Sequence, residues 1–467
     1  MRREFHQDLN IWFRQENRKP LILRGARQVG KTTSVRIFAR EQGLTLIEVN
    51  MEDPQLFISL IKNNNPIEIF EILALERNIS LLHPDKMVIF FDEAQECPAI
   101  IPFLRYCFER AKEFAVICAG SLLEFTLAEA SSSFPVGRVE YLYLGPMTFE
   151  EYLLANSKQK LLEQILSTDF DNIITSPIHD LLDIQFREYL LCGGMPEAVK
   201  IKSEKGSLVM LEKVKSSILE SYYSDFPKYK KYTHLRPDID TLQSIFEKLP
   251  MQIGNKIKYV KLVENTKAEK VKRGISFLEK ALIASLSYHT SASKPPLKAL
   301  KNEKWFKLFF LDVGLVQSQL GLSIENIKSQ PEINHIAKGA LAEQFIAQHL
   351  LQYRPSFLKP ELFHWSRNTK GSEAEVDFMI EFDGQIIPIE VKAGTSRTMR
   401  SLIMLQKEKK FPLAVRFYSG LPKIETLSLT EVDDFFEYQL LSLPHYLVGQ
   451  LSRIFTILTK PNYPNAV

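Results

Sequence analysis

Residues 25–32 have the types and the spacing of a phosphate-binding loop. They read Gly-Ala-Arg-Gln-Val-Gly-Lys-Thr and lie between an apolar segment, 21–23, and a helix-like segment, 33–39. Glycines let backbone N–H groups and the N-terminus of the following helix face phosphate oxygens. Lys31 is expected to reach the β- and γ-phosphates, and Thr32 to bind Mg²⁺. An accidental match at a strand-to-helix turn is disfavoured by the flanking segments, so the chain is predicted to bind ATP or GTP.

An acidic strand end supplies what hydrolysis of the nucleotide needs. Residues 87–91 are an unbroken apolar run, as a buried parallel strand requires, and Asp92 and Glu93 follow it. Asp92 is expected to complete the Mg²⁺ ligands, and Glu93 to polarise the attacking water. The same pattern is typical of an acidic helix cap. Because it lies downstream of a phosphate loop, we favour hydrolysis.

Two further residues are predicted to act on the transferring phosphate. Ser121 follows the apolar segment 114–120, so its hydroxyl is expected to sense the γ-phosphate. Arg138 follows a glycine and is the best candidate for a cation acting on the phosphate, within the chain or across a subunit boundary. A solvated arginine after a turn is the alternative. The residues predicted to bind the nucleotide are Gly25, Ala26, Arg27, Gln28, Val29, Gly30, Lys31, Thr32, Thr33 and Ser121.

A second set of chemically competent residues lies in a predicted hairpin near the end of the chain. Segments 375–380 and 385–392 indicate adjacent strands, separated by a turn at residues 383–384. Pairing of these strands would bring Asp377, on the first, close to Glu390, on the second. The hairpin therefore predicts two carboxylates at one place.

Asp377, Glu390 and Lys392 are the residue types of a metal-dependent phosphodiesterase. Glu390 and Lys392 share one face, because side chains alternate along a strand. Two carboxylates can hold Mg²⁺ or Mn²⁺, and a lysine can orient the attacking hydroxide and offset phosphate charge. Glu343, in a predicted helix upstream, adds a candidate metal ligand. The alternative is a surface hairpin with an exposed Glu–Lys pair; we favour a nuclease-type site, active or inert.

The N-terminal motifs require a parallel α/β sheet to position them. Apolar runs alternate with helical patterns, which favours a sheet covered by helices on both faces. The predicted strands are 20–23, 44–49, 87–91, 114–119 and 139–144. A capped helix start at 148–152 then opens a mostly helical stretch to about residue 190. The break at 190–196, with two glycines and a proline, predicts a hinge or a tight turn.

The chain after residue 205 predicts a lysine-rich helical segment with a two-stranded wing. Cations precede an apolar helix in 265–283, and segments 285–289 and 305–311 flank a Lys-Pro-Pro-Leu-Lys turn. This arrangement is typical of a winged helix, which docks on duplex phosphates and a groove. A protein–protein spacer with a solvated lysine face is the alternative. The basic segment 228–232, just upstream, favours DNA.

Composition places the chain among multidomain globular proteins. Its 467 residues suggest about three domains, and 45% hydrophobic content suffices for ordinary cores. The net charge of +3 permits nucleic-acid contact without arguing for it. The 4 cysteines lack CxxC spacing and are predicted to be reduced core thiols. With neither an apolar leader nor an apolar run of ~18 residues, the chain is predicted to be cytoplasmic, with no membrane association.

Eight short motifs follow one another in a specific order along nearly the whole chain. They lie at 25–32, 91–95, 119–121, 137–138, 192–197, 310–315, 375–378 and 389–392. As a set they resemble prokaryotic AAA-type ATPases that carry a C-terminal restriction-endonuclease-like domain of uncharacterised function. The resemblance implies an ATPase core, a winged-helix segment and a PD-(D/E)xK nuclease-like fold, with ATP and a divalent metal as ligands. The proline expected before Asp377 is absent, a common departure in that fold.

Together these inferences predict a multidomain α/β protein. Its parts are a P-loop ATPase core (1–150), a helical lid or hinge (151–204), a winged-helix-like domain (205–328) and an α/β nuclease-like domain (329–467). The predicted catalytic residues are Lys31, Asp92, Glu93, Arg138, Asp377, Glu390 and Lys392, and the predicted metal ligands are Thr32, Asp92, Glu343, Asp377 and Glu390.

The leading functional hypothesis is a DNA-associated enzyme in which ATP hydrolysis repositions a Mg²⁺-dependent phosphodiesterase. One alternative is a nucleotide-controlled module that binds DNA or protein and has a catalytically silent nuclease fold. Another is a ring-forming remodeller of proteins, which would assemble into homo-oligomers with ATP.

Overall fold

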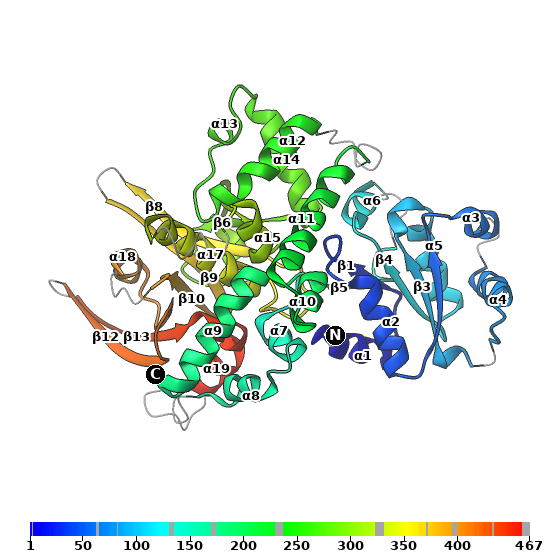
Figure 1. Ribbon diagram of the computed structural model, residues 1–467, viewed down its shortest axis with the longest axis horizontal. Helices are drawn as coiled ribbons and strands as arrows, with labels where there is room; N and C mark the ends of the chain where they lie inside the picture. Colours follow the sequence, from blue (N-terminus) through cyan, green and yellow to red (C-terminus); the bar gives the residue numbers. More distant parts are fainter. Residues whose placement is uncertain are drawn as a thin grey trace.

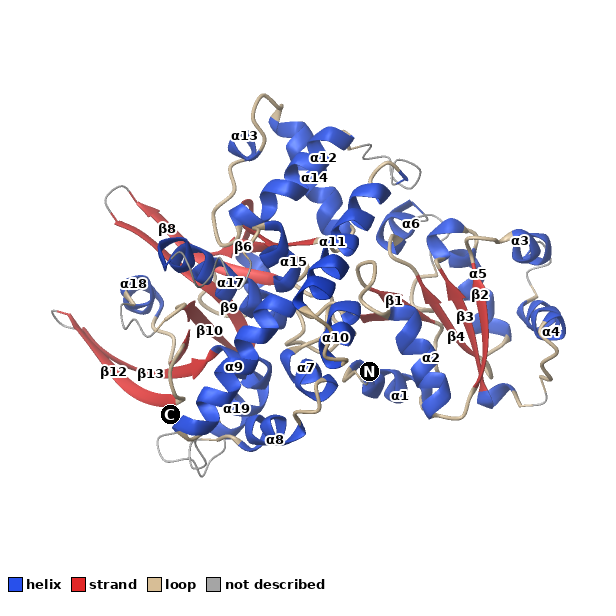
Figure 2. Ribbon diagram, in the orientation of Figure 1, coloured by secondary structure: helices blue, strands red, loops and turns tan. Residues whose placement is uncertain are grey.

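The computed structural model shows two α/β parts with helices between them (Figure 1). It describes residues 1, 3–61, 65–81, 83–129, 135–169, 174–228, 237–322, 331–369, 372–394, 399–431 and 434–459. The described strands gather into two separate sheets, as the colouring by secondary structure shows (Figure 2). No helix in these ranges is both long and apolar enough to cross a bilayer.

The N-terminal part holds, within the described residues, a five-stranded parallel sheet of order β2-β3-β4-β1-β5. Its strands are β1 (Leu21–Arg24), β2 (Thr45–Asn50), β3 (Met87–Asp92), β4 (Ala115–Ala119) and β5 (Glu140–Tyr143). Every residue of β3 and β4 is buried, which explains their unbroken apolar sequences. The predicted parallel sheet and its strands are confirmed.

Helices cover both faces of this sheet. They are α1 (Phe5–Phe13), α2 (Lys31–Glu41), α3 (Gln55–Ile61), α4 (Pro66–Glu76), α5 (Ile100–Arg110) and α6 (Leu123–Glu129). Buried residues of α1 and α2 belong to one apolar core, and those of α3, α4 and α5 to another. The sheet thus separates two cores, as predicted for a P-loop fold.

A helical segment follows the N-terminal sheet. Its helices are α7 (Phe149–Ala155), α8 (Gln159–Ser167), α9 (Ser176–Cys192), α10 (Pro196–Ser203) and α11 (Leu208–Asp225). The predicted capped start is confirmed: the Thr148 side chain accepts a hydrogen bond from the Glu151 N–H, and the Glu151 carboxylate accepts one from the Thr148 N–H.

The glycine break between α9 and α10 is a tightly packed turn. Gly193 has φ +75°, and a Cβ there would collide with the Asp312 carboxylate. Gly194 N–H donates to the same carboxylate at 2.6 Å. Of the two predicted alternatives, the contacts favour a tight turn over a free hinge.

The predicted wing exists as a hairpin, but it is not a separate module. The preceding helices are α12 (Ile239–Lys248), α13 (Tyr259–Leu262) and α14 (Ala268–Lys280), and β6 (Ala284–Thr290) pairs antiparallel with β7 (Lys301–Phe310). The other edge of β6 pairs with β8 of the C-terminal part. A hairpin with a bare edge would leave backbone groups unpaired, so it joins the larger sheet. The sheet therefore crosses the domain boundary expected between 328 and 329. Most of the basic segment 228–232 lies outside the described residues.

The C-terminal part is a mixed sheet whose described strands have the order β12-β13-β11-β10-β9-β8-β6-β7. Beyond the hairpin its elements are α15 (Val313–Gln319), α17 (Pro331–Leu350), β8 (Leu362–Thr369), β9 (Ser372–Phe382), β10 (Gln385–Val391), α18 (Arg400–Lys409), β11 (Leu413–Tyr418), β12 (Lys423–Glu431), β13 (Asp434–Pro444) and α19 (Leu451–Leu458). The predicted turn between β9 and β10 has φ +45° at Asp383 and +73° at Gly384. Positive φ at both residues is the requirement of a two-residue type I′ hairpin.

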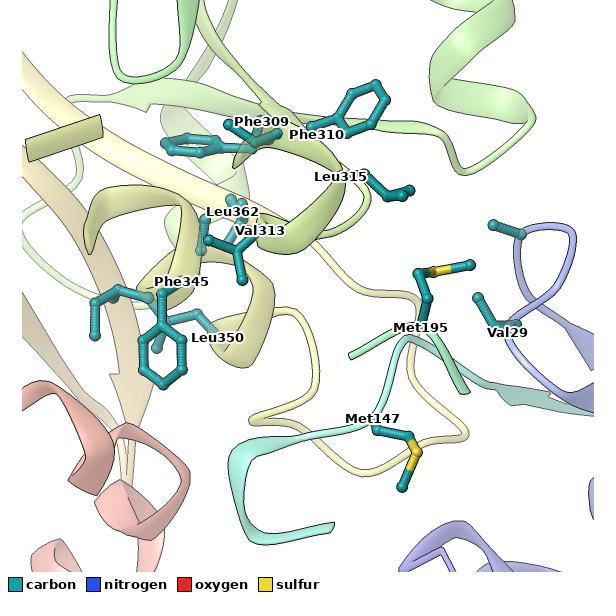
Figure 3. Close-up of a cluster of buried hydrophobic side chains, with 14 of the residues drawn as sticks. Val29, Met147, Met195, Phe309, Phe310, Val313, Leu315, Phe345, Leu350 and Leu362 are labelled. Atoms are coloured by element: carbon teal, nitrogen blue, oxygen red, sulfur yellow. The ribbon is translucent and has the colours of Figure 1, made fainter. Parts of the chain in front are cut away.

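An apolar core connects the two parts. It includes Val29 of the phosphate loop, Met195 of the glycine turn and Phe345 of α17. Figure 3 shows Met195 beside Val29, with Phe310 and other C-terminal side chains continuing the cluster. A close-packed interior transmits displacement, so the phosphate loop is in mechanical contact with the C-terminal part.

All 4 cysteines lie within the described residues, buried and unpaired. Burial raises the pKa of the Cys107 and Cys192 thiols, the latter to about 12. They are core side chains, as the sequence predicts.

Candidate functional site

The phosphate loop joins the end of β1 to the start of α2. Gln28 has φ +64° and Gly30 φ +96°, so the loop turns through left-handed conformations. A Cβ at Gly25 would collide with the backbone oxygen of Leu144. The loop therefore needs both of its glycines, one for its backbone conformation and one for a close backbone contact.

Lys31 is the first residue of α2, and its side chain turns back into the loop. Its Nζ donates hydrogen bonds of 2.8 Å to the carbonyl oxygens of Gly25 and Ala26. Burial lowers the pKa of Lys31 to about 8, while the charges of Glu93 and Asp92 favour the ammonium form. Phosphate oxygens beside the ammonium would favour that form further.

Thr32 and Asp92 bring together a hydroxyl and a carboxylate. Thr32 Oγ1 donates to Asp92 Oδ2 at 2.6 Å, and the Glu93 N–H donates to Oδ1 at 3.0 Å. Burial raises the pKa of Asp92. Such oxygen donors are the ligands that Mg²⁺ prefers, usually one or two from protein together with water and nucleotide phosphates. These two residues fit a nucleotide-bound Mg²⁺.

Glu93 lies in an uncommon backbone conformation directly after Asp92. Its φ of 49° and ψ of 43° are left-handed, which is costly for a residue with a Cβ. Gln95 Nε2 donates to Glu93 Oε2 at 2.6 Å and so orients the carboxylate. A Cβ at Gly120, the residue before Ser121, would collide with Gln95, so the chain after β4 lies against this turn. Sequence reasoning assigned no role to Gln95.

Arg138 does not approach the phosphate loop of its own chain. Its Nε lies 2.8 Å from Glu109 Oε1. It precedes β5, whose first residue, Glu140, pairs with Leu21 at the start of β1. The phosphate loop follows the opposite end of β1, since parallel strands share their orientation. The expectation of a role within the chain is therefore wrong; the role across a subunit boundary stays a prediction.

Side chains from remote parts of the sequence bind carbonyl oxygens of the phosphate loop, and sequence reasoning did not find them. Arg3 Nη1 donates to the Val29 oxygen at 3.1 Å, and Arg3 Nε lies 2.7 Å from Glu151 Oε2. From α11, the Tyr222 hydroxyl donates to the Arg27 oxygen at 2.7 Å. These partners are remote in sequence, and no local pattern indicates them.

The β9–β10 hairpin brings Asp377 and Glu390 together. Ile389 pairs with Phe378 in the ladder. The next residues along the two strands are Glu390 and Asp377, and the Val391 N–H donates to Asp377 Oδ2 at 2.8 Å. The predicted proximity of the two carboxylates follows from this register.

Glu390 and Lys392 share one face, as predicted, and form an ion pair with an N–O distance of 2.6 Å. The Glu390 side chain is only 6% exposed. Its Oε2 is buried and has no hydrogen-bond partner among the described residues. Burial, and next the charge of Asp377, raise the pKa of Glu390 to about 8.

Lys307 of β7 is the main component of this cluster that sequence reasoning missed. Its side chain is fully buried, and its Nζ pairs with Glu375, with Asp377 Oδ1 at 3.5 Å and with Glu343 Oε2 at 3.8 Å. Burial disfavours the ammonium, but the three carboxylates outweigh it and raise the pKa of Lys307. Burial and the charge of Asp377 raise the pKa of Glu343 to about 7. The contact with Glu375 crosses the sheet, so no sequence spacing reveals it.

The cluster offers two candidate ligands for a divalent ion, Asp377 and Glu390, rather than a complete set of metal ligands. In the part of the chain that the structure describes, no three histidine, cysteine, aspartate or glutamate side chains converge on one metal position. The buried, unpartnered Oε2 of Glu390 and the adjacent Asp377 still fit an ion such as Mg²⁺, which needs only one or two carboxylates.

Residues 17–153 match a family described as an AAA domain. The N-terminal part is an AAA P-loop domain. The matched range includes the phosphate loop, Asp92, Glu93, Ser121 and Arg138, so these residues all lie within this one domain.

The rest of the chain matches families without an assigned function. Residues 183–326 and 338–433 each match a domain of unknown function, DUF8612 and DUF4143 respectively. Neither description names a nuclease, so the C-terminal assignment is a proposal. No curated protein matches the chain.

Solved structures resemble this chain only distantly. Over 68% of this chain and 95% of the other, it is similar to the Walker-type ATPase PABY2304 of Pyrococcus abyssi, with 14% identity and a TM-score of 0.43. Over 70% and 94%, it is similar to the Aeropyrum pernix ORC2 protein in ADPNP–ADP complexes, with 13% identity and a TM-score of 0.33. Likenesses this distant do not indicate function.

Proposed function

We propose that the AAA domain binds ATP with Mg²⁺ and hydrolyses it. One observation carries the proposal: Thr32 Oγ1 and Asp92 Oδ2 are already 2.6 Å apart beside the buried ammonium of Lys31. Lys31 would offset charge on the β- and γ-phosphates, and Thr32 and Asp92 would hold the ion. Mg²⁺ held by these two residues would supply positive charge that offsets the charge developing on the transferring phosphate.

Glu93 is the residue that we propose to act on the attacking water. A carboxylate held by Gln95 can orient a water and accept its proton. Ser121, beside the same turn, is proposed to contact the γ-phosphate. Arg138 of a second copy would supply the cation, because the Arg138 of the same chain lies at the other end of the sheet.

We further propose that the C-terminal cluster is a Mg²⁺- or Mn²⁺-dependent deoxyribonuclease site controlled by the AAA domain. Support comes from the convergence of Asp377, Glu390 and Lys392 around a buried, unpartnered carboxylate oxygen. Asp377 and Glu390 would hold the ion, and Lys392 would offset charge on the phosphodiester. Exposed lysines at and before α14, among them Lys267 and Lys272, offer contacts to DNA phosphates.

A second candidate function is a nucleotide-controlled module that binds DNA or protein without cutting. The observation that favours it is Lys307, which already neutralises three carboxylates of the cluster. A lysine that neutralises these carboxylates can stabilise a nuclease-like fold that binds no metal ion and therefore cuts no DNA.

The experiment that separates these candidates is a cleavage assay on linear, supercoiled and single-stranded DNA. It would use Mg²⁺ or Mn²⁺, with and without ATP, and compare the native protein with Lys392→Ala, Lys31→Ala and, as a surface control, Lys423→Ala. Cutting that is lost only in Lys392→Ala would establish the nuclease, and an ATP effect lost in Lys31→Ala would establish its control. Cutting of no DNA would support the binding module.

Phosphate release in the same reactions tests ATP hydrolysis separately. We expect release by the native protein and by Lys423→Ala, and none by Lys31→Ala. Release that persists in Lys31→Ala would contradict the assignment of the phosphate loop.

A further inference from the structure

The carboxylate cluster contains a buried cation of its own. Lys307 is fully buried on β7, and its Nζ lies among oxygens of Glu343, Glu375 and Asp377. Burying an ammonium is costly unless carboxylates pair with it. The buried ammonium therefore needs the three carboxylates from α17 and β9, and these carboxylates need the ammonium to offset their charge.

The position of Lys307 is fixed by the surrounding fold. Gln344, the residue after Glu343 on α17, exchanges two hydrogen bonds with the backbone of Phe310 on β7, at 2.8 and 2.7 Å. The helix and strand that carry Glu343 and Lys307 are thus joined directly. The buried ammonium is part of this packed arrangement of helix and strand.

The pairing of Lys307 divides the oxygens of the cluster into two groups. Asp377 Oδ1, Glu343 Oε2 and Glu375 face the ammonium, whereas Asp377 Oδ2 accepts the Val391 N–H of β10. Glu390 Oε1 pairs with Lys392, and Glu390 Oε2 is buried with no hydrogen-bond partner among the described residues. Glu343 Oε2 also has no hydrogen-bond partner among the described residues, but it lies 3.8 Å from the Lys307 ammonium, whereas Glu390 Oε2 lies on β10 beside Asp377 and outside the group that surrounds Lys307.

We propose that Lys307 is a built-in cation that takes the place of a second metal ion, so that the cluster binds a single divalent ion at Asp377 and Glu390. The inference rests on the proposed metal site and specifies its stoichiometry. Phosphodiester chemistry commonly uses two metal ions about 4 Å apart, and a fixed ammonium can supply the second charge without being lost.

Lys307 acts as a positioning residue in this scheme. Being fully buried, it does not touch a DNA phosphate; it holds Asp377 and Glu343 and neutralises them. Glu343, predicted from the sequence to be a metal ligand, instead belongs to the group that surrounds the lysine.

The test is a count of Mn²⁺ ions by titration of the full-length, nucleotide-free protein, followed by electron paramagnetic resonance. The number that matters is the number of Mn²⁺ ions bound by the native protein minus the number bound by Asp377→Ala. Ions bound at the AAA domain are present in both proteins and cancel. We expect one Asp377-dependent ion, with the spectrum of an isolated Mn²⁺. We expect two ions, magnetically coupled, in Lys307→Met, because three carboxylates then lack their cation, and one again in Lys307→Arg.

Lys256→Met is the matched control, since Lys256 also pairs with Glu375, at 3.3 Å, but is 35% exposed. It should keep the count at one. Two ions in the native protein, or one in a Lys307→Met variant that still binds ATP, would overturn the inference and leave the metal site standing. No Asp377-dependent ion would instead remove the metal site itself. If Lys307→Met does not fold, the native count alone decides between one ion and two.

Discussion

Asp312 binds the backbone of Gly194 across the junction of the two parts: its Oδ2 accepts the Gly194 N–H at 2.6 Å. Its Oδ1 accepts the N–H groups of Gly314 and Leu315 at the start of α15. Gln348 of α17 donates to the same carboxylate at 3.2 Å. A single buried side chain thus ties the turn after α9 to the helix that carries Glu343.

The other end of this connection reaches the nucleotide site. Pro196, two residues after Gly194, packs against Gly30 of the phosphate loop: a Cβ added to Gly30 would lie 3.4 Å from the Pro196 Cγ. A nucleotide that shifts this loop would press on a turn that Asp312 anchors to the C-terminal part. The contacts offer a physical route by which ATP could act on the carboxylate cluster.

Asp312→Ala should lower the free energy of unfolding by about 3 kcal/mol or more, because it leaves several buried N–H groups without an acceptor. Asp238 is the matched control: it also caps a helix, accepting the Thr241 N–H, but its side chain is 32% exposed. Asp238→Ala should cost about 1 kcal/mol. Urea unfolding followed by circular dichroism measures both, and equal losses would contradict the anchoring role.

Glu93→Gln should keep ATP binding and slow hydrolysis by about 100-fold or more, because the amide cannot accept a proton from water. Gln95→Ala, which removes the 2.6 Å hydrogen bond to Glu93, should give a smaller loss. Binding of a fluorescent ATP analogue and phosphate release measure the two properties. Glu96→Gln, on the same turn, is the control, and full turnover in Glu93→Gln would refute the assignment.

Arg138→Ala should abolish hydrolysis only if Arg138 acts on a neighbouring copy. Mixing Arg138→Ala with Lys31→Ala protein should then restore part of the activity, because some interfaces contain an intact loop and an intact arginine. Arg105 is the matched control, since it pairs with the same Glu109 oxygen, at 2.9 Å. An unchanged rate in Arg138→Ala, or equal losses in both variants, would exclude the intersubunit role.

Acid should weaken the junction through His349 of α17. Its Nε2 accepts the Phe149 N–H at 2.9 Å, and burial lowers its pKa to about 4. Since the unfolded chain binds the proton near pH 6.5, the stabilisation is complete above that pH. It is lost as pH falls from 6.5 to 4, up to about 3 kcal/mol.

The free energy of unfolding of His349→Gln should therefore depend less steeply on pH between 6.5 and 4. Part of the slope should remain, because burial also lowers the pKa of His445 to about 4. The exposed His83 is the control, and His83→Gln should follow the native profile. An unchanged slope in His349→Gln would show that this histidine is not the group that titrates.

Local sequence was enough to predict the elements that carry the nucleotide site. The phosphate loop, the apolar runs of β3 and β4 and the capping box at Thr148 each depend on residues a few positions apart. The Asp383-Gly384 turn fixed the register that brings Asp377 to Glu390 in the same way. The prediction that the wing belongs to a separate winged-helix module was wrong. The second edge of β6 pairs with β8, more than sixty residues downstream, which no local pattern indicates.

The sequence by itself determined the strands of the N-terminal sheet, the β9–β10 hairpin, and which residues have the chemistry of a nucleotide site and a carboxylate pair. Only the tertiary structure decided which charges meet. Lys307 is one lysine of many until β7, β9 and α17 place it among three carboxylates, and Asp312 is one aspartate until Gly194 lies against it. The physical reason is that the cost of burying a charge or an N–H depends on every neighbour at once, and those neighbours come from remote parts of the chain.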